Sequence, residues 1–212
     1  MLRINKPGAW LLLIIVLTMI VFASSCGQFL SGSYPTQTNP NDLSYLSSLD
    51  GSELAVFDNS KLPITPIEDL HVAGSGPKTV DIEDYRLTVD GFLDKPLTLT
   101  YGEIMRYPTV THAVLLVCPN FFADNAEWTG VLVSTLLAEA GVMPQAKQVT
   151  FYALDGYQRT LSLEEVKSDG VFLAHTVDGQ VLPKEHGYPL RLVVKGVFGD
   201  SWVKWVDQIK IS

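Results

Sequence analysis

The stretch THAVLLVCPNFFADNAEWTGV, from Thr111 to Val131, decides the fold of this chain. Its apolar run from Ala113 to Val117 predicts a buried strand, and Pro119 and Asn120 predict the end of that strand. Cys118 therefore stands at a strand-to-loop corner, where proteins often place reactive groups. A second interpretation stays open from these residues alone, because free cysteines are often buried and only fill space.

The remaining folded sequence predicts short strands and brief helices. Thr100 and Glu103 form a capping box for a helix that Pro108 ends, Ser162 and Glu165 repeat the motif, and an amphipathic helix is predicted over 134–140. The predicted strands are 85–89, 97–100, 149–161 as a hairpin around Asp155-Gly156, 171–177, 190–194 and 203–211. Strands and helices do not alternate regularly, which indicates one α+β domain and not a doubly wound sheet.

The N-terminus has the pattern of an export segment. Arg3 and Lys6 precede an apolar run over 9–23, and small residues lead to Cys26. The run is short for a membrane span, which needs about 20 apolar residues, so residues 1–25 predict a signal peptide or, alternatively, an N-terminal anchor. The Ala-Ser-Ser-Cys junction resembles a bacterial lipoprotein signal, which implies lipidation of Cys26 and a location on the extracytoplasmic side of the cell membrane.

The composition changes twice after this segment. Residues 26–60 are rich in Ser, Gly, Pro, Thr, Asn and Gln and predict a flexible tether. Near Leu62 apolar residues return, so we expect the folded domain at 61–212. If Cys26 carries lipid, Cys118 has no partner for an intramolecular disulfide; a Cys26–Cys118 bridge is the alternative.

The chain is acidic, with a formal net charge of -8 and a pI near 4.9. This balance argues against a nucleic-acid partner or an anionic lipid surface. An anionic ligand would need a local basic cluster, and residues 184–204 contain one: Lys184, His186, Arg191, Lys195 and Lys204. Glycines in this segment let the backbone approach a ligand, so it is a candidate phosphate cradle. A pair of strands with solvated basic residues is the alternative.

Two further histidines are candidates. His112 lies on the predicted Cys118 strand and could face the same pocket, and His175 precedes a turn, where its ring could act as an acid or a donor. Each is equally consistent with a packed or surface histidine. The sequence has no zinc-ligand spacing, no GxSxG, no GxGxxG that opens a helix and no P-loop.

Taken together, these segments resemble the sulfite-oxidase-type molybdopterin-binding domain, and the resemblance extends from about Leu62 to Ser212. It is carried, in order, by CPNFF from Cys118, EWTGVL from Glu127, DGY from Asp155, the Leu173-Ala174 and Asp178-Gly179 pairs, EHGYPLRLVV from Glu185, and VKWV from Val203. The resemblance implies an α+β domain with a mixed, barrel-like sheet and short helices.

The resemblance also implies a cofactor and an activity. Cys118 would ligate molybdenum through its thiolate, a soft ligand suited to a high-valent metal. His186, Arg191 and Lys204 would hold the pterin and its phosphate by charge-assisted hydrogen bonds. The expected chemistry is a two-electron oxygen-atom transfer on a small molecule. No CxxCH haem motif is present, so electrons would pass through a separate partner.

The sequence departs from the family at several positions. In the segment that begins with Leu173-Ala174, the family carries an active-site tyrosine where this chain has His175, which makes His175 a candidate for substrate contact or proton delivery. Lys195 replaces a usual proline, and the arginine- and histidine-bearing lead-in motif is missing. Sulfite is therefore not the expected substrate. The N-region has no Arg-Arg pair for export in the folded state. An exported domain that kept the fold without the metal, and acts as a binding or structural module, is the alternative function.

Overall fold

The computed structural model describes residues 42–74 and 76–212, which belong to one compact unit, Asn39–Ser212. The predicted signal peptide or anchor and the first part of the predicted tether lie outside these residues. Within the described part of the chain, no helix combines the length and the apolar character that crossing a membrane requires.

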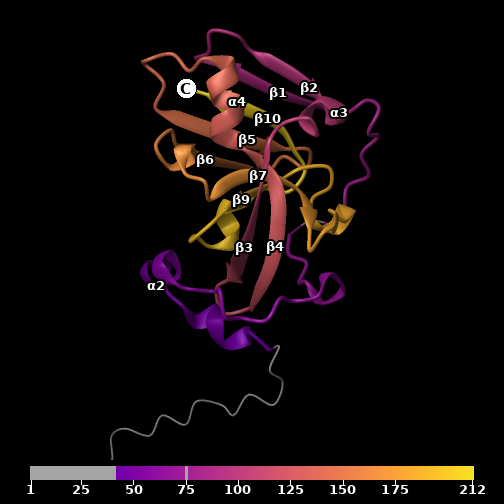
Figure 1. Cartoon of the computed structure of the whole chain (residues 1–212), viewed down its shortest axis with the longest axis vertical. Coiled ribbons are helices and arrows are strands. Elements are labelled where there is room, and N and C mark those ends of the chain that lie inside the picture. Colours follow the sequence, from indigo (N-terminus) through magenta and orange to yellow (C-terminus); the bar gives the residue numbers. More distant parts are fainter. Residues whose placement is uncertain (1–41, 75) are drawn as a thin grey trace, which may run out of the picture. The chain divides into compact units, whose positions relative to one another are not determined.

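The first sheet pairs β1, the first strand of the domain, with β10, its last strand (Figure 1). Its strand order is β2-β1-β10-β5-β6, with β1 parallel to β10 and the other pairs antiparallel. The strands are β1 (Arg86–Gly91), β2 (Leu97–Thr100), β5 (Gln148–Ala153), β6 (Gln158–Ser162) and β10 (Val206–Ile211). The turn between β5 and β6 carries Asp155 and Tyr157, which become part of the site described below.

The second sheet carries Cys118. Antiparallel strands follow the order β3-β4-β7-β8, and β9 also pairs with β7. The strands are β3 (Thr109–Cys118), β4 (Phe122–Leu132), β7 (Val171–Val177), β8 (Gln180–Val181) and β9 (Arg191–Val194). The expected α+β fold of mixed sheets with short helices is confirmed, and its strands form two sheets of five.

The strand end predicted at Cys118 is confirmed, but the loop after it is a turn of only three residues, because β4 begins at Phe122 and pairs with β3 along its length. Asp124 and Asn125 interrupt the apolar pattern of this strand although both are buried. Their polar atoms are satisfied by partners distant in sequence: His71 for Asp124, and Asn59 with the carbonyls of residues 62 and 63 for Asn125. Buried polar side chains with hydrogen-bond partners break the apolar pattern by which a buried strand is recognised in a sequence, so β4 was not predicted.

The helices are short. The predicted capping box begins α3 (Tyr101–Ile104), where the Glu103 N–H donates to Thr100 Oγ1 at 3.2 Å. Helix α4 (Val133–Ala140) ends at Gly141, which has the left-handed φ of 70° that favours glycine. The other short elements are η1 (Ser44–Ser48), α2 (Gly51–Val56), η2 (Ile67–Asp69), η3 (Glu165–Lys167), η4 (Lys184–His186) and η5 (Gly199–Ser201).

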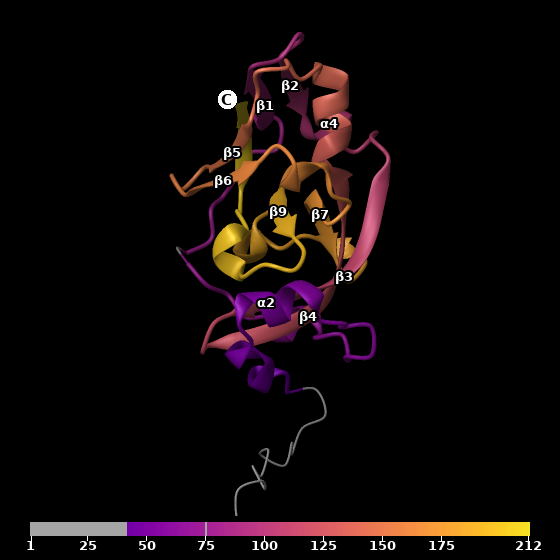
Figure 2. The ribbon, with the colours of Figure 1, turned by 90° about the vertical axis from the view of Figure 1, so that its left-hand side faces the viewer.

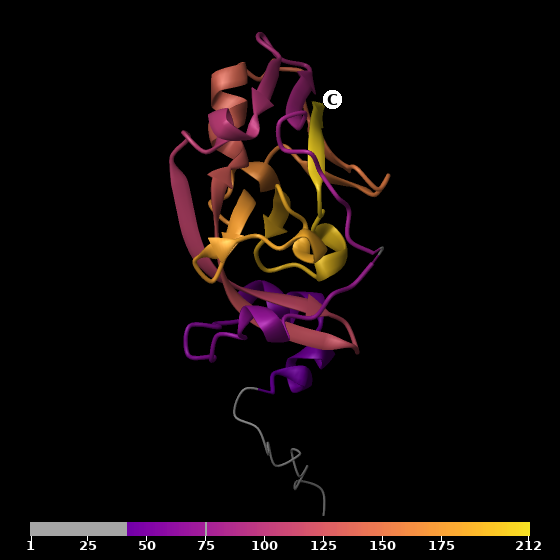
Figure 3. The same cartoon turned by 90° about the vertical axis from the view of Figure 1, so that its right-hand side faces the viewer.

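Strand β3 lies between two apolar clusters, because successive side chains of a strand point to opposite faces of the sheet. Leu116 and Cys118 face the main core, whereas Leu115 and Val117 face a second cluster formed with Leu43, Leu46 and Leu54. The segment that bears η1 and α2 therefore packs against the β3–β4 hairpin, as Figures 2 and 3 also show.

The prediction that residues 26–60 form a flexible tether is corrected for its described part, from residue 42 onward. Three leucines of this polar segment are buried, and the Asn120 N–H donates to the Ser47 carbonyl at 2.9 Å. An Asp50–Glu53 capping box begins α2. The leucines find their partners on β3 and β4 and not within the segment, so local composition does not reveal the packing.

Candidate functional site

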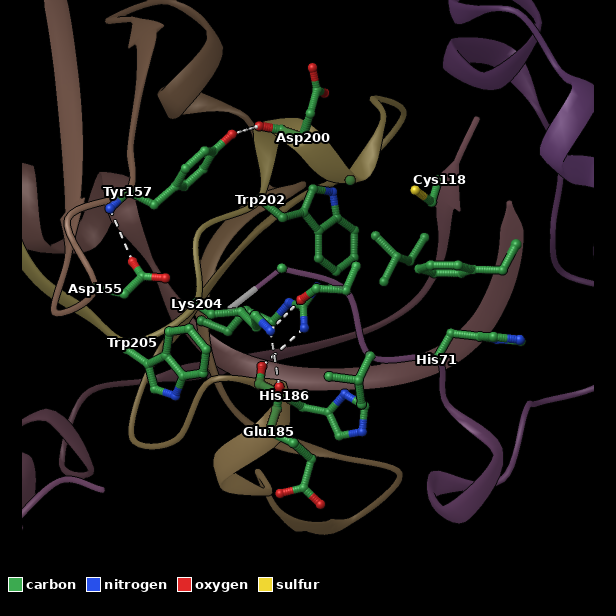
Figure 4. A pocket seen from close by; sticks show the side chains of 17 residues that line it. His71, Cys118, Asp155, Tyr157, Glu185, His186, Asp200, Trp202, Lys204 and Trp205 are labelled. Carbon is green, nitrogen blue, oxygen red and sulfur yellow. Dashed lines mark hydrogen bonds between the residues drawn. The ribbon is translucent and has the colours of Figure 1, made fainter. Parts of the chain in front are cut away.

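A cavity of about 320 Å³ opens where five segments of the chain meet (Figure 4). The segments are residues 71–74, the β3–β4 hairpin, the β5–β6 turn, residues 185–191 and residues 199–205. Four of the five predicted site residues line this cavity: Cys118, His186, Arg191 and Lys204. The structure thus brings together residues that the sequence separates by up to 86 positions.

Cys118 contributes a half-buried thiol at the end of β3. The hairpin turn holds it in place, since the Phe121 N–H donates to the Cys118 carbonyl at 3.0 Å and Asn120 adopts a positive φ of 63°. Burial raises the pKa of the thiol, and the negative charge of Asp200 raises it further. The sulfur is therefore a neutral thiol until a cation binds it and displaces the proton.

Arg191 provides a buried positive charge. Its guanidinium carbon lies 5.2 Å from the ring centroids of both Trp128 and Trp202, and Nη1 donates to the His186 carbonyl at 3.0 Å. Burial lowers the pKa of Arg191 to about 10, so the side chain stays charged at neutral pH. Among the described residues, Nε has no hydrogen-bond partner. A buried cation in a residue that lines a cavity favours an anion there.

His186 ends η4 and is buried beside this charge. Burial lowers the pKa of the imidazole, and Arg191 lowers it further, so the ring is neutral at pH 7. Gly187 follows with a φ of 115°, and a Cβ atom there would lie 3.1 Å from the Lys204 Cα atom. Glycine thus allows the 185–187 turn to lie directly against Lys204.

Lys204 is held by backbone carbonyls. Its Nζ donates to Ala73 at 2.6 Å and to Glu185 at 3.2 Å, and lies 4.5 Å from the centroid of the Trp205 ring. Burial, and then the charge of Arg191, lower the pKa of Lys204 to about 8. The ammonium group is charged at neutral pH and loses its proton readily under mildly alkaline conditions.

This depressed pKa predicts a pH-dependent stability. Above pH 8 the folded protein releases the Lys204 proton, whereas the unfolded chain keeps it up to its ordinary pKa of 10.5. The unfolded state then binds more protons, so this group makes the free energy of unfolding rise with pH in that window. Urea unfolding of cofactor-free protein at about pH 7.5 and about pH 9.5 should show the wild type gaining stability relative to Lys204→Met. Identical pH dependence in the two proteins would contradict the assignment.

His71 also lines the cavity, although no sequence pattern predicts a role for it. Its Nδ1 lies 2.8 Å from Oδ1 of the buried Asp124, its backbone N–H donates to Oδ2 at 2.9 Å, and its ring stacks on Phe122 at 4.7 Å. The pairing orients a half-exposed imidazole at the cavity edge. The two residues are 53 positions apart, so no local pattern joins them.

His175 lies elsewhere. Thr129 pairs with Thr176 and Gly130 with Ala174, which makes His175 the extra residue of a β-bulge in β7. Its ring is buried, does not line the cavity, and has no hydrogen-bond partner among the described residues. Burial lowers the pKa of the ring. The position therefore does not support the predicted contact with a substrate in this cavity.

Three other predicted candidates also lie outside the cavity. The His112 ring packs 5.7 Å from the Phe172 ring, on the same strand as Cys118 but away from its end. Lys184 and Lys195 are exposed and do not line the cavity. Two of the five basic residues of 184–204 are thus solvated, as the alternative interpretation held, and the other three line the cavity.

Comparisons with known proteins find several relatives of this chain. The chain is 29% identical over 189 residues to the NADPH nitrate reductase of Aspergillus niger, covering 74% of this chain and 22% of that protein. It is 31% identical over 177 residues to the NADPH nitrate reductase of Beauveria bassiana, covering 68% and 20%. It is also 28% identical to the uncharacterized oxidoreductase YuiH of Bacillus subtilis, covering 66% and 71%. The chain thus spans about a fifth of the nitrate reductases' length.

Among solved structures, the sulfane dehydrogenase SoxCD from Paracoccus pantotrophus is similar, with a TM-score of 0.67 and 27% sequence identity. The similarity covers 98% of this chain and 59% of that one. Residues 73–212 match the model of the oxidoreductase molybdopterin binding domain, and this match extends over more than half of the chain. On this evidence the chain belongs to the family of oxidoreductase molybdopterin binding domains.

Proposed function

We propose that this domain holds molybdenum-molybdopterin in the cavity and carries out a two-electron oxygen-atom transfer on a small molecule outside the cytoplasm. The observation that carries the proposal is the meeting of a half-buried thiol with two cations in one cavity of an acidic chain. Cys118, Arg191 and Lys204 come from separate segments of the chain. The fold brings them together although both cations lose part of their contact with water. Burial lowers the pKa of both cations.

The side chains fit the cofactor that the family implies. The positive charges of Arg191 and Lys204, which both line the cavity, suit a phosphate. Cys118 offers a soft sulfur ligand, which suits a metal that takes its other sulfur ligands from the pterin. Among the described residues no cluster of three or more His, Cys, Asp or Glu side chains could hold a metal ion. The thiol is therefore the protein ligand that these residues provide.

When bound, the cofactor supplies a metal centre that can exchange an oxygen atom and two electrons. Cys118 anchors it at the end of β3, and Arg191 and Lys204 neutralise the phosphate at the η4 turn. Phe122 and Trp202 line the cavity between these groups and exclude water. His71 keeps its Nδ1 on Asp124, so Nε2 is the ring atom that can give a proton to a molecule in the cavity or take one from it.

The location and the partners of the domain are part of the proposal. The pattern of residues 1–25 and the Cys26 junction support export and attachment to the extracytoplasmic side of the cell membrane, through lipid or an anchor. The absence of a CxxCH motif supports a separate electron-transfer partner.

Metal analysis of the wild type tests the proposal. Protein expressed in a host that makes molybdopterin should contain about one molybdenum and one pterin per chain, the stoichiometry of a single site. The same protein from a host that cannot make the cofactor should fold and lack both. A stable, metal-free wild type from the competent host would overturn the enzymatic function and support the alternative, a binding or structural module of the same fold.

A further inference from the structure

Carboxylates lie on more than one side of the cavity. Asp155 comes from the β5–β6 turn and Glu185 from η4, and both line the cavity and are partly exposed. In the view of Figure 4, Asp155 lies on the left and Glu185 at the bottom, with its carboxylate pointing away from the cavity. The Tyr157 N–H donates to Asp155 Oδ1 at 3.0 Å and holds this side chain at the turn. These two negative charges therefore lie at the rim of the cavity and not at its centre.

A second cavity, of about 330 Å³, adjoins the first beside the β3–β4 hairpin. Phe122 and His71, which pairs with Asp124, line both cavities. Asp42 and Asp69 line the second cavity and are exposed. Carboxylates thus continue around the hairpin side of the site, and together they form an acidic rim that consists of Asp42, Asp69, Asp155 and Glu185.

The cations nearby do not cancel the charge of this rim. Arg159 Nη1 lies 4.0 Å from Asp200 Oδ2, so the charges of these two residues offset each other. Arg191 is buried, and the Lys204 ammonium is held by two backbone carbonyls. Lys184 is exposed but lines neither cavity. Among the described residues that line the two cavities, the exposed charge is therefore mainly negative.

Apolar side chains are exposed within the acidic rim. Phe121, at the hairpin tip, lines the second cavity and is 80% exposed. Val72 and Tyr157 line the first cavity and are 53% and 45% exposed. Exposed apolar residues rimmed by polar groups are typical of interaction surfaces. A small hydrated cation makes no use of them, and the rim repels an anionic lipid surface. A protein face with basic residues around an apolar centre matches both features.

We infer that the acidic rim, together with Phe121, Val72 and Tyr157, is a docking surface for a protein partner that presents a basic face with an apolar centre. Docking there places the partner over the opening of the cavity. This position suits a small basic electron carrier. The electron-transfer role rests on the proposed function, whereas the docking itself does not.

A basic probe protein tests the docking without the cofactor. Cytochrome c is a small basic electron carrier, and its acetylated form, in which the lysine charges are neutralised, is the control for the charge of the partner. Each is titrated by calorimetry into the full-length, cofactor-free protein in a neutral detergent at low salt. Wild type should bind native cytochrome c and should bind the acetylated form much more weakly, because the acidic rim attracts lysine side chains.

Neutralising the rim localises the binding. The rim variant is Asp69→Asn/Asp155→Asn/Glu185→Gln. Its control changes two aspartates and one glutamate that are exposed and line neither cavity: Glu83→Gln/Asp84→Asn/Asp94→Asn. The rim variant should bind native cytochrome c about 5- to 50-fold more weakly, the range for three exposed charge pairs, and the control should stay within about 2-fold of the wild type. The difference should shrink in about 0.5 M NaCl, where exposed charges are screened.

The apolar centre has its own matched pair of variants. Phe121→Ser should weaken the binding of native cytochrome c by about 3-fold or more, since it removes an aromatic contact without changing a charge. Val56→Ser makes a similar change at a side chain that is 83% exposed and lines neither cavity, and it should bind like the wild type.

Three results would each overturn the inference: equal binding by the rim and control variants, equal binding of native and acetylated cytochrome c, or no binding at low salt. A fourth is that Phe121→Ser weakens binding to neutral phosphatidylcholine vesicles and leaves cytochrome c binding unchanged, because the apolar residues would then face a lipid surface. Metal analysis tests the proposed function separately. A metal-free wild type that binds the basic probe at the rim would overturn the enzymatic function and keep the docking surface.

Discussion

Replacing Cys118 with serine is expected to lower the molybdenum content from about one atom per chain to less than about a tenth, and activity by more than about 100-fold. Losing an outer partner of a metal ligand already costs 10- to 100-fold, so losing the ligand itself should cost more. A serine hydroxyl is harder than a thiolate and does not ionise at neutral pH. Metal analysis of protein purified from a cofactor-competent host measures the change.

The second cysteine provides the matched control. Cys26→Ser makes the same chemical change outside the described domain, so the molybdenum content should stay at the wild-type level. Urea midpoints of cofactor-free wild type and Cys118→Ser should agree closely, because the thiol is only half-buried and the substitution changes little volume. Full molybdenum content in Cys118→Ser would show that the phosphate-binding cations hold the cofactor without the thiol.

Removing two leucines beneath the β3–β4 hairpin should have the largest effect on stability. Leu46 and Leu54 are each 3% exposed and pack with Leu115, Val117 and Ala123. A buried leucine truncated to alanine costs about 2 to 5 kcal/mol, so Leu46→Ala/Leu54→Ala should lose about 4 kcal/mol or more of the free energy of unfolding. This is a large share of the stability of an ordinary domain. Urea unfolding of the cofactor-free protein gives the value.

The same substitution at an exposed leucine is the control, because it makes the same chemical change without removing a buried side chain. Leu154→Ala changes a side chain that is 45% exposed and should stay within about 0.5 kcal/mol of the wild type. The double variant should also label faster at Cys118 with a neutral thiol reagent, because the segment that supports the hairpin turn is loosened. If its stability and labelling rate equal those of the wild type, residues 42–60 act as the flexible tether that their composition predicts.

The strands that the sequence predicts correctly share one property: their patterns are local. The alternation before Asp90-Gly91, the hairpin around Asp155-Gly156 and the capping box at Thr100 each depend on neighbours within a few residues. Strand β4 lacks such a pattern because Asp124 and Asn125 are buried with distant polar partners.

The same distinction applies to the site. Cys118, Arg191 and Lys204 were predicted from a strand end and from a resemblance in residue order, and the structure brings them together. His71 was not predicted, because Asp124, which orients its ring, lies 53 positions away in the sequence. His175 was predicted from its position beside a family tyrosine, but the bulge in β7 places its ring outside the cavity.

The sequence by itself determined the fold class, the position of Cys118 at the end of a strand, and the basic residues that are available to an anion. Alternation, stop signals and charge can all be read from neighbouring residues. Only the tertiary structure decided which of those residues share a cavity, that residues 42–60 support the cysteine hairpin, and that His71 joins the cavity through Asp124. These features depend on contacts between segments far apart in the chain, and packing makes such contacts without leaving a local pattern.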